Sequence, residues 1–360
     1  MRNICFFSGD ITRGGGTEKT SIMLANALVR QGKYRILFLS LVEHAQKPFF
    51  ELHSDIKHYV LGKRWITPGP GYLRVIPRLR NFVIEHKIDV LIDIDIVLDV
   101  LSIPVAGKLG IKVISWEHFS YGYEMKSWYR RYILKYSVRH TDYIVTLTEE
   151  DRNMYMKKTG RTQNICAIYN PIQEVADCPN LQKEKWLVTV GHLIKRKGTD
   201  YLAKVALQVL NQCPDWKWMV VGSGEDYAYL KAFIKEHNLA GRLILTGRTK
   251  DVNSYLEKSQ IYVMTSRSEG LPMVLLEAKA CNLPTVSFDI RTGPREIIED
   301  GVNGYLIPPF DCEKMAERLK QLICDEELRT EFAKHARNQM DKFRLENIVG
   351  RWNQIFKAVL

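Results

Sequence analysis

Residues 260–277 read QIYVMTSRSEGLPMVLLE, and this stretch predicts a strand, a turn and a helix in succession. Its first six residues are apolar and β-branched enough for a buried strand. Gly270 suits a turn that a ligand can approach closely, and Pro272 suits the first position of a helix. Because backbone N–H groups at a helix start favour an anion, the stretch predicts a phosphate-binding turn. Glu269 lies just before this helix and Glu277 in its second turn.

Outward from this stretch, strand and helix patterns alternate along the chain. Further strands are expected at residues 3–8, 35–40, 89–94, 112–115, 143–147, 186–190, 217–221, 243–246 and 285–288. Helices are expected at residues 18–30, 73–86, 98–109, 124–139, 200–212, 226–237 and 252–258, and from residue 315 to the end. Strands separated by helices indicate parallel βαβ units.

The domain organisation follows from length and from one polar stretch. A chain of 360 residues exceeds what one core usually organises, so two domains are expected. The predicted fold class is α/β, with two doubly wound, Rossmann-like domains that face a cleft. The polar stretch after Pro171 reads as the linker. We expect domains at residues 1–170 and 171–340, and a final helix at residues 341–360 that packs back on the N-terminal domain.

Charge and composition limit the class of protein. The net charge is +11, and residues 1–170 hold 25 Lys and Arg against 16 Asp and Glu. This excess predicts an anionic partner such as a phosphorylated lipid or a membrane leaflet, and no motif supports nucleic acid. The seven cysteines are scattered without a C-x-x-C pair, which argues against disulfides and structural zinc. No apolar run is long enough for a membrane span or a signal peptide, so we expect a cytoplasmic protein.

A glycine-rich loop, GDITRGGGT at residues 9–17, lies between the first strand and the first helix. It fails the P-loop pattern at Arg13 and Glu18, and it fails the dinucleotide pattern at Lys19. A tight strand-to-helix turn would explain the glycines as well as a ligand would.

A basic loop follows the strand at residues 186–190. Residues 191–198 read GHLIKRKG and place three consecutive cations at the carboxyl end of that strand. Such cations would neutralise a diphosphate leaving group. A solvated charge run is the alternative, and the position at a strand end favours a site.

Two further features are weaker. Asp93 and Asp95 resemble the D-x-D pairs that hold a metal in one class of sugar transferases, but no second ligand cluster completes a site, so no metal is expected. His118 follows a strand in the sequence WEHF and reads either as a structural residue or as a ligand contact, and we favour the contact.

The segment at residues 124–139, EMKSWYRRYILKYSVR, combines aromatic and basic residues on one predicted helix. Trp128, Arg130, Arg131 and Lys135 would suit contact with an acceptor at a membrane interface. A packed helix with a solvated basic face explains the pattern equally well.

Four motifs give the C-terminal half a resemblance to glycosyltransferase family 4, retaining enzymes of GT-B architecture, of the bacterial surface-polysaccharide type. They are residues 191–198, the sequence VVGSG at 220–224, the E-G-x-P-x-x-x-x-E pattern from Glu269 to Glu277, and residues 296–304. The N-terminal half is similar more loosely, through GGGTE at residues 14–18 and the sequence WEH.

The resemblance implies roles for the residues already described. Lys197 and the backbone N–H groups near Gly270 and Leu271 would contact the donor diphosphate. Glu269 would hold the hydroxyls of the transferred sugar, and Glu277 would hold the ribose.

Other implied roles concern the rest of the site. The loop at Gly15 and Gly16 would lie against donor phosphates or acceptor. The family's usual arginine is replaced by His192, so Arg196 is expected to help Lys197, or His192 to charge on binding. Catalysis is assigned to Glu269 and Lys197, with His118.

The resemblance implies a hexosyltransferase that retains configuration and uses a UDP-sugar donor without a metal or other cofactor. The acceptor would be a lipid-linked or surface-polysaccharide glycan at the anionic inner face of the cell membrane. The sequence DIRTGPRE at residues 289–296 is similar to members that handle galactose or N-acetylgalactosamine, and glucose stays open. An accessory subunit that binds nucleotide-sugar, or a phosphorylase or epimerase, is the alternative.

Overall fold

The computed structural model describes residues 1–62, 70–125, 127–172 and 183–360 and divides the chain into two units. Unit 1 comprises Met1–Pro171 with Asp341–Leu360, and unit 2 comprises Ile172–Met340. The predicted linker falls mainly on residues 173–182, which lie outside the described residues.

Unit 1 is built on a parallel sheet in the order β3-β2-β1-β4-β5-β6-β7. The strands are β1 (Arg2–Ser8), β2 (Tyr34–Ser40), β3 (Lys57–Val60), β4 (Val90–Ile94), β5 (Lys112–Trp116), β6 (Tyr143–Thr146) and β7 (Ile165–Ala167). The central strand β4 is buried along its whole length, as expected where helices cover both faces of a parallel sheet.

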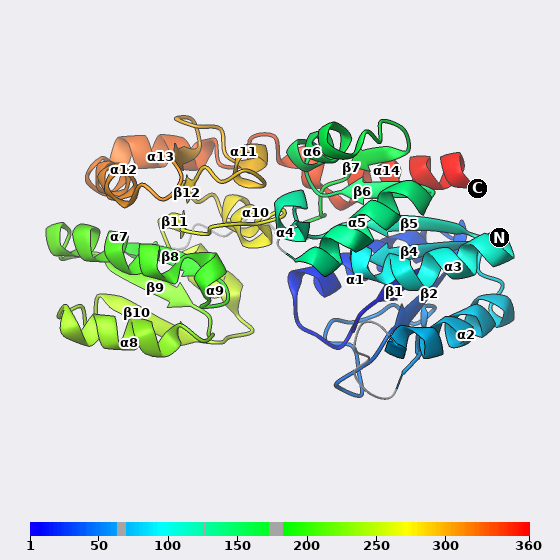
Figure 1. The fold of residues 1–360 in the computed structure, drawn as a ribbon. Coiled ribbons are helices and arrows are strands. Elements are labelled where there is room, and N and C mark those ends of the chain that lie inside the picture. The colour runs from blue at the N-terminus through cyan, green and yellow to red at the C-terminus, as the bar shows by residue number, and fades with distance from the viewer. Residues whose placement is uncertain (63–69, 126, 173–182) are drawn as a thin grey trace. The chain divides into compact units, whose positions relative to one another are not determined.

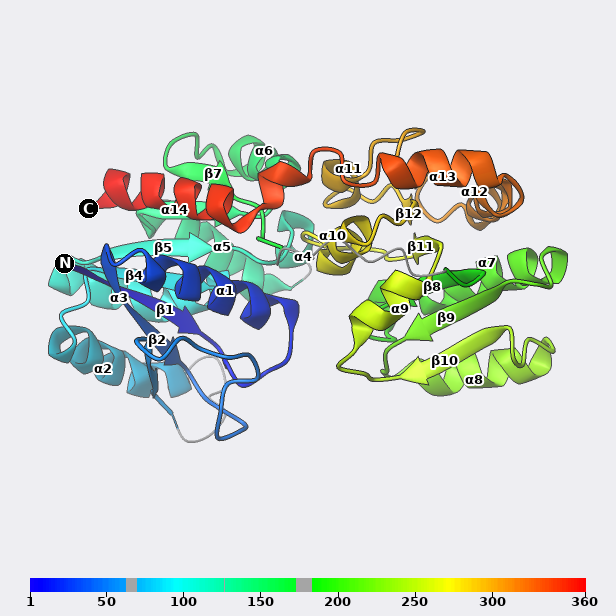
Figure 2. The ribbon, with the colours of Figure 1, turned by 180° about the vertical axis from the view of Figure 1, so that it is seen from behind.

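The helices of unit 1 lie on both faces of this sheet. They are α1 (Gly16–Arg30), α2 (Pro70–Glu85), α3 (Asp99–Leu109), α4 (Tyr121–Glu124), α5 (Trp128–His140), α6 (Glu149–Thr159) and α14 (Leu345–Val359), with the 3-10 helices η1 (Ile96–Leu98) and η3 (Met340–Phe343) at their sides. Figure 1 shows α2, α3 and α5 on the near face, and Figure 2 shows α1 and α14 side by side on the opposite face.

Unit 2 repeats this plan with the strand order β10-β9-β8-β11-β12-β13. The strands are β8 (Trp186–Val190), β9 (Lys217–Val221), β10 (Leu243–Gly247), β11 (Ile261–Met264), β12 (Thr285–Phe288) and β13 (Gly304–Ile307). The helices are η2 (Lys195–Lys197), α7 (Thr199–Gln212), α8 (Tyr227–Glu236), α9 (Val252–Lys258), α10 (Met273–Ala280), α11 (Pro294–Ile297), α12 (Cys312–Cys324) and α13 (Glu326–Lys334). Helix α7 packs against α8 and α12, and α9 packs against α10.

In both sheets the direction of winding reverses once. The reversal lies between β1 and β4 in unit 1 and between β8 and β11 in unit 2. Ligands of doubly wound sheets bind outside the carboxyl ends of the strands at such a switch point. A ligand site is therefore expected in the loops that follow these four strands.

Helix α14 returns to unit 1 from the far end of the sequence. Trp352 is fully buried, with its ring 5.0 Å from that of Trp116, and the ring of Phe356 lies 5.1 Å from that of Tyr34. Buried aromatic pairs of this kind fix the helix on the unit.

The prediction of two doubly wound parallel α/β sheets is confirmed, but the strands β3, β7 and β13 and the helices α4, α6 and α11 were not predicted. Strands β3, β7 and β13 have only three or four residues each, too few for a clear alternation. Helix α6 has only Asp151 and Tyr155 buried, so its sequence carries almost no apolar periodicity.

Two predicted helices are wrong in extent. The helix predicted at residues 124–139 is α5, which begins only at Trp128, because the Ser127 hydroxyl accepts from the Arg130 N–H at 3.1 Å and caps the helix there. The segment from residue 315 to the end is divided into α12, α13, η3 and α14, and Asp325 caps α13 by accepting from the Leu328 N–H.

Candidate functional site

The loop after β8 packs directly against the turn after β11 at the switch point of unit 2. Gly198 has a φ of 70°, and a Cβ there would lie 1.9 Å from the carbonyl oxygen of Thr265. Only glycine fits this approach. The Arg267 N–H donates to the Arg196 carbonyl at 2.8 Å. These contacts bring the predicted cation loop and the predicted carboxylate turn together.

The carboxylate of Glu269 is the centre of this cluster. Its Oε1 lies 2.6 Å from Lys197 Nζ and accepts from Ser266 Oγ at 2.6 Å. Its Oε2 lies 3.5 Å from Arg196 Nη1. Only 7% of the Glu269 side chain is exposed, against 25% of Lys197 and 34% of Arg196. The cluster thus joins a buried acceptor to two cations that solvent can reach.

The charge state of Glu269 follows from these neighbours. Burial alone would raise the pKa of Glu269, but Lys197, Arg196 and the Ser266 hydroxyl together hold that pKa below its usual value. The carboxylate is therefore ionised at neutral pH and can only accept hydrogen bonds. A ligand with hydroxyl groups can donate to it, and an anion can bind the same two cations.

Arg267 and Asp200 brace the cation loop from the side. The Arg267 guanidinium donates to both carboxylate oxygens of Asp200, at 2.7 and 2.6 Å, and to the Lys195 carbonyl at 2.7 Å. It also lies over the Tyr201 ring, 4.0 Å from the centroid. A bidentate and stacked arginine holds one geometry, so the loop is preorganised. Sequence reasoning missed this pair, whose members are 67 positions apart.

The loop after β12 supports the turn from behind. Thr292 Oγ1 donates to the Glu269 carbonyl at 2.5 Å. A Cβ at Gly293 would lie 2.9 Å from the Gly270 carbonyl oxygen and 2.5 Å from Pro272 Cδ, so the two segments are in close contact. Thr292 thus links residues 289–296, the segment whose sequence is similar to that of galactose-handling members, to the Glu269 backbone.

Helix α10 carries the second predicted carboxylate. The helix begins at Met273, one residue later than predicted, because Pro272 has a non-helical ψ of 99°. Glu277 is half-buried on α10. Burial raises the pKa of the Tyr262 hydroxyl, and the negative charges of Glu269 and Glu277 raise it further. Both carboxylates therefore lie close enough to the buried Tyr262 side chain to affect its ionisation. Gly270 is half-buried and Leu271 is buried at the same turn.

His192 stands apart from this cluster. Its side chain is exposed at the beginning of the loop, whereas the Glu269 carboxylate is held by Lys197, Arg196 and Ser266.

In unit 1 the glycine loop leads into α1, and Glu18 covers the start of that helix. A Cβ at Gly15 would lie 2.5 Å from Glu18 Oε2. Burial raises the pKa of Glu18, while the backbone at Gly15 and at Glu18 itself hydrogen-bonds to the carboxylate. Gly16 is exposed as the first residue of α1. The positive end of the helix is therefore already matched by a carboxylate.

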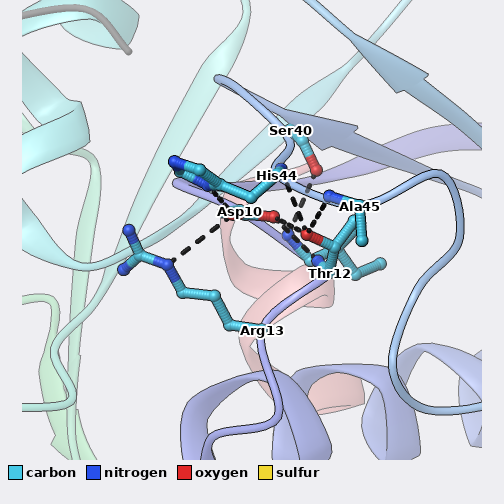
Figure 3. A network of polar contacts seen from close by, with 7 residues as sticks. Asp10, Thr12, Arg13, Ser40, His44 and Ala45 are labelled. Atoms are coloured by element: carbon cyan, nitrogen blue, oxygen red, sulfur yellow. Dashed lines mark hydrogen bonds and ion pairs between the residues drawn. The ribbon is translucent and has the colours of Figure 1, made fainter. Parts of the chain in front are cut away.

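A second polar network joins the loops after β1 and β2, and sequence reasoning did not find it (Figure 3). Asp10 Oδ1 accepts from the Thr12 N–H at 2.8 Å and from Thr12 Oγ1 at 2.6 Å. Asp10 Oδ2 lies 2.6 Å from His44 Nδ1 and 3.7 Å from Arg13 Nε. The Asp10 carboxylate is fully buried, and burial would raise its pKa, but Thr12 and His44 hold that pKa below its usual value.

His118 follows β5 in a buried position. Burial lowers the pKa of its imidazole to about 3, so the ring is neutral. The ring lies 4.5 Å from that of Trp116, and its buried Nε2 has no hydrogen-bond partner among the residues described. The neutral imidazole can make hydrogen bonds to a ligand through its one N–H and its one unprotonated nitrogen. It is not a positively charged proton donor.

Helix α5 presents an exposed aromatic and basic face. Trp128 and Tyr132 are 75% and 66% exposed, and Arg131 and Lys135 are exposed with them. Arg130 differs, because its guanidinium lies 3.0 Å from Asp95 Oδ1 and packs over the rings of Phe119 and Tyr123. In the described parts of the chain, no helix is long and apolar enough to cross a bilayer.

The D-x-D pair is divided between two environments. Asp93 is buried and accepts from Ser102 Oγ at 2.7 Å, whereas Asp95 pairs with Arg130. Within the described ranges, no group of three or more His, Cys, Asp and Glu residues could hold a metal ion.

Two parallel α/β units, the second with a cation-paired carboxylate at its switch point, define the class of GT-B glycosyltransferases. Residues 14–174 match the family model described as Glycosyltransferase Family 4, and residues 174–339 match the model described as Glycosyl transferases group 1. The chain belongs to glycosyltransferase family 4.

Similar known proteins align with almost the whole length of the chain. A glycosyltransferase of Haemophilus influenzae is 35% identical, over 99% of this chain and 100% of that protein. A Campylobacter jejuni protein, named GalNAc-alpha-(1->4)-GalNAc-alpha-(1->3)-diNAcBac-PP-undecaprenol alpha-1,4-N-acetyl-D-galactosaminyltransferase, is 26% identical over 100% of this chain and 99% of its own. The structure of Anabaena HepE in complex with UDP-glucose has a TM-score of 0.81 at 18% identity, covering 99% of both chains. The family and the GT-B fold implied by the sequence are confirmed.

Proposed function

We propose that this chain is a retaining hexosyltransferase that moves the sugar of a UDP-sugar to a lipid-linked or surface-polysaccharide acceptor. The observation that carries the proposal is the buried Glu269 carboxylate held by Lys197 and Arg196 at the switch point of unit 2. A nucleotide-sugar offers both partners that this cluster suits, phosphates for the cations and hydroxyls for the carboxylate.

Each donor contact follows from the position of the residue. Lys197 and Arg196 would turn from Glu269 to the diphosphate, together with the backbone N–H groups at Gly270 and Leu271. Glu269 would then accept hydrogen bonds from the hydroxyls of the sugar. Glu277, half-buried on α10, would hold the ribose.

The candidate sugars are galactose, N-acetylgalactosamine and glucose. The first two are favoured by the sequence of residues 289–296, in which Thr292 holds the Glu269 carbonyl. The Campylobacter relative is named as an N-acetylgalactosaminyltransferase, and HepE binds UDP-glucose.

The reaction needs stabilisation of a departing diphosphate. The bond between the anomeric carbon and the diphosphate oxygen breaks through an oxocarbenium-like state, and the two cations stabilise the charge that develops on the diphosphate. The acceptor oxygen forms its bond on the same face, and its proton passes to the departing diphosphate. This order requires no protein nucleophile and retains the anomeric configuration.

Unit 1 would supply the acceptor side. The neutral imidazole of His118, with its buried Nε2, would contact a hydroxyl of the bound sugar or acceptor. The loop at Gly15 and Gly16 would lie against the donor phosphates or the acceptor, and Gly16 is exposed at the start of α1. The exposed face of α5, with Trp128, Arg131 and Lys135, would lie on the anionic inner surface of the cell membrane.

A donor screen tests this function. Purified protein is supplied with each of the three UDP-sugars and a bacterial membrane-lipid extract, and release of UDP is measured with and without EDTA. We expect acceptor-dependent release with one donor, unchanged by EDTA because Lys197 and Arg196 supply the positive charge. No release with any UDP-sugar would overturn the proposed donor, and loss of release in EDTA would overturn the metal-free mechanism.

A further inference from the structure

We propose that Phe49, packed on Gly14 of the glycine loop, is the platform on which a sugar ring of the acceptor stacks. The inference rests on the proposed function, which takes the acceptor to be a glycan, and it adds the chemical group that unit 1 recognises, a neutral pyranose. Phe49 is 47% exposed in the loop after β2. It lies at the carboxyl edge of the sheet, where ligands of doubly wound folds bind.

Phe49 meets the glycine loop because the loops after β1 and β2 lie against each other. The Val42 N–H donates to the Gly9 carbonyl at 3.1 Å. Further along both loops, a Cβ at Gly14 would lie 3.1 Å from three carbon atoms of the Phe49 ring. Glycine therefore lets the ring lie directly on the backbone, and this contact accounts for one of the three consecutive glycines.

Two anchors hold the loop on either side of Phe49. Before it, His44 Nδ1 lies 2.6 Å from the fully buried carboxylate of Asp10 (Figure 3). After it, Asn26 Oδ1 on α1 accepts from the His53 N–H at 2.8 Å. Single exposed apolar residues are common on proteins. Phe49 differs from most of them because it is fixed in place beside a loop that is expected to contact a ligand.

The surroundings of Phe49 suit a sugar better than a lipid chain. Its ring meets that of Phe50 edge-on, with 5.0 Å between centroids and 73° between planes, so the two rings form no single flat apolar surface. Residues 44–47, with the sequence HAQK, are exposed and mostly polar. A lipid chain needs a continuous apolar groove. A pyranose needs one aromatic face, whose negative charge attracts its C–H groups, and polar neighbours for its hydroxyls.

Substitutions of Phe49 test this contact with methyl glycosides of galactose, N-acetylgalactosamine and glucose as probes. Binding to the full chain is measured by saturation-transfer NMR, with UDP present at saturation to occupy the donor site. We expect wild type and Phe49→Tyr to bind at least one glycoside, with most saturation on the C–H protons of one ring face. Phe49→Ala and Phe49→Leu should each weaken binding about threefold to tenfold, the loss of one aromatic contact.

Tyr229→Ala is the matched control, because Tyr229 is 44% exposed on α8 of unit 2. It should change glycoside affinity less than about twofold. An equal loss in this control would show that the effect of Phe49→Ala is not local, and it would overturn the inference.

Gly14→Ala tests the seat of the ring separately. The backbone of Gly14 is open to alanine, but the added methyl group must displace the Phe49 ring. Glycoside binding should therefore weaken in Gly14→Ala and weaken no further when Gly14→Ala is added to Phe49→Ala. The same loss in both backgrounds would show that Gly14 faces the ligand itself, and it would contradict the platform.

Four other outcomes would overturn the inference. They are an absence of glycoside binding by wild-type protein, unchanged binding in Phe49→Ala, full binding in Phe49→Leu, and a fall in liposome co-sedimentation of Phe49→Ala. The third would show that apolar volume is sufficient, and the fourth would assign the ring to lipid.

These results can be separated from the proposed function. In turnover, Phe49→Ala should raise the KM of the acceptor and leave the KM of the UDP-sugar unchanged. Failure of the donor screen with Phe49-dependent glycoside binding would reject the transferase reaction but keep the platform. Turnover with an acceptor KM that Phe49→Ala does not change would reject the platform but keep the reaction.

Discussion

Single residues in this chain take their charge state from the side chains around them. The sequence indicated that Lys197, Arg196 and Glu269 belong to a site, because both motifs follow predicted strands. It could not indicate that both cations contact the Glu269 carboxylate. They lie 72 and 73 positions away from Glu269 in the sequence, and only the order of the strands in the sheet brings them together. The contact of Thr292 with Glu269 and that of His44 with Asp10 were missed for the same reason, because 23 and 34 positions separate the partners.

The burial of Asp93 and Asp99 makes the stability of the protein depend on pH. Both are fully buried in unit 1, and burial raises the pKa of Asp99 to about 7 and that of Asp93 well above its usual value. The folded protein therefore keeps protons that the unfolded chain releases near pH 4. Because the native state then binds more protons, the free energy of unfolding falls as pH rises from about 4 to about 7.

We predict that Asp99→Asn removes much of this fall. At pH 8 the variant should be more stable than wild type by on the order of 1–4 kcal/mol, since no buried proton must be lost. Urea unfolding at pH 5 and pH 8 measures this, with the exposed Asp55→Asn as the control. Equal pH dependence in wild type and Asp99→Asn would contradict the prediction.

Secondary-structure elements were predictable where apolar periodicity was strong. Strands such as β1 and β4 were found because their residues are buried and apolar. The start of α5 was predicted too early because it depends on one serine cap, and α6 was missed because almost none of its side chains is buried.

Helix α14 is the element whose contribution to unit 1 can be measured most simply. We predict that Trp352→Ala destabilises the protein by about 3–5 kcal/mol, because it removes a fully buried indole packed against Trp116 and Phe356. Alanine favours the helix, so the loss would reflect packing. Thermal unfolding monitored by circular dichroism gives the result, and Lys357→Ala on the exposed side of α14 should unfold like wild type.

Helix α5 supports a prediction about membrane binding. Liposomes that contain anionic lipid should bind the protein, and binding should weaken with added salt because Arg131 and Lys135 supply the attraction. Co-sedimentation of Trp128→Ala with the same liposomes should fall, because the indole is the most exposed aromatic group on the helix. Arg130→Gln is not a suitable test, since this arginine is paired with Asp95. Equal binding to neutral liposomes at high salt would show that the charge of α5 is incidental.

At the scale of the whole molecule, the chain has two α/β units with different tasks in the proposed reaction. Unit 2 holds the cluster suited to a nucleotide-sugar, and unit 1 holds the Asp10 network, His118 and the exposed face of α5. The fold and family could be predicted from motifs spread over both halves. The sugar could not, because the choice between hexoses depends on individual hydroxyl contacts rather than on any motif.

The most direct test of the central claim is UDP release by wild type, Lys197→Gln and Glu269→Gln with the preferred donor and acceptor. Glu313→Gln is the matched control, because it removes an exposed carboxylate from unit 2 far along the chain from the cluster. We predict that kcat falls about 100-fold or more in the first two variants and stays within about twofold of wild type in the control, with folding unchanged in all three. Full activity in a folded Glu269→Gln or Lys197→Gln protein would contradict the account.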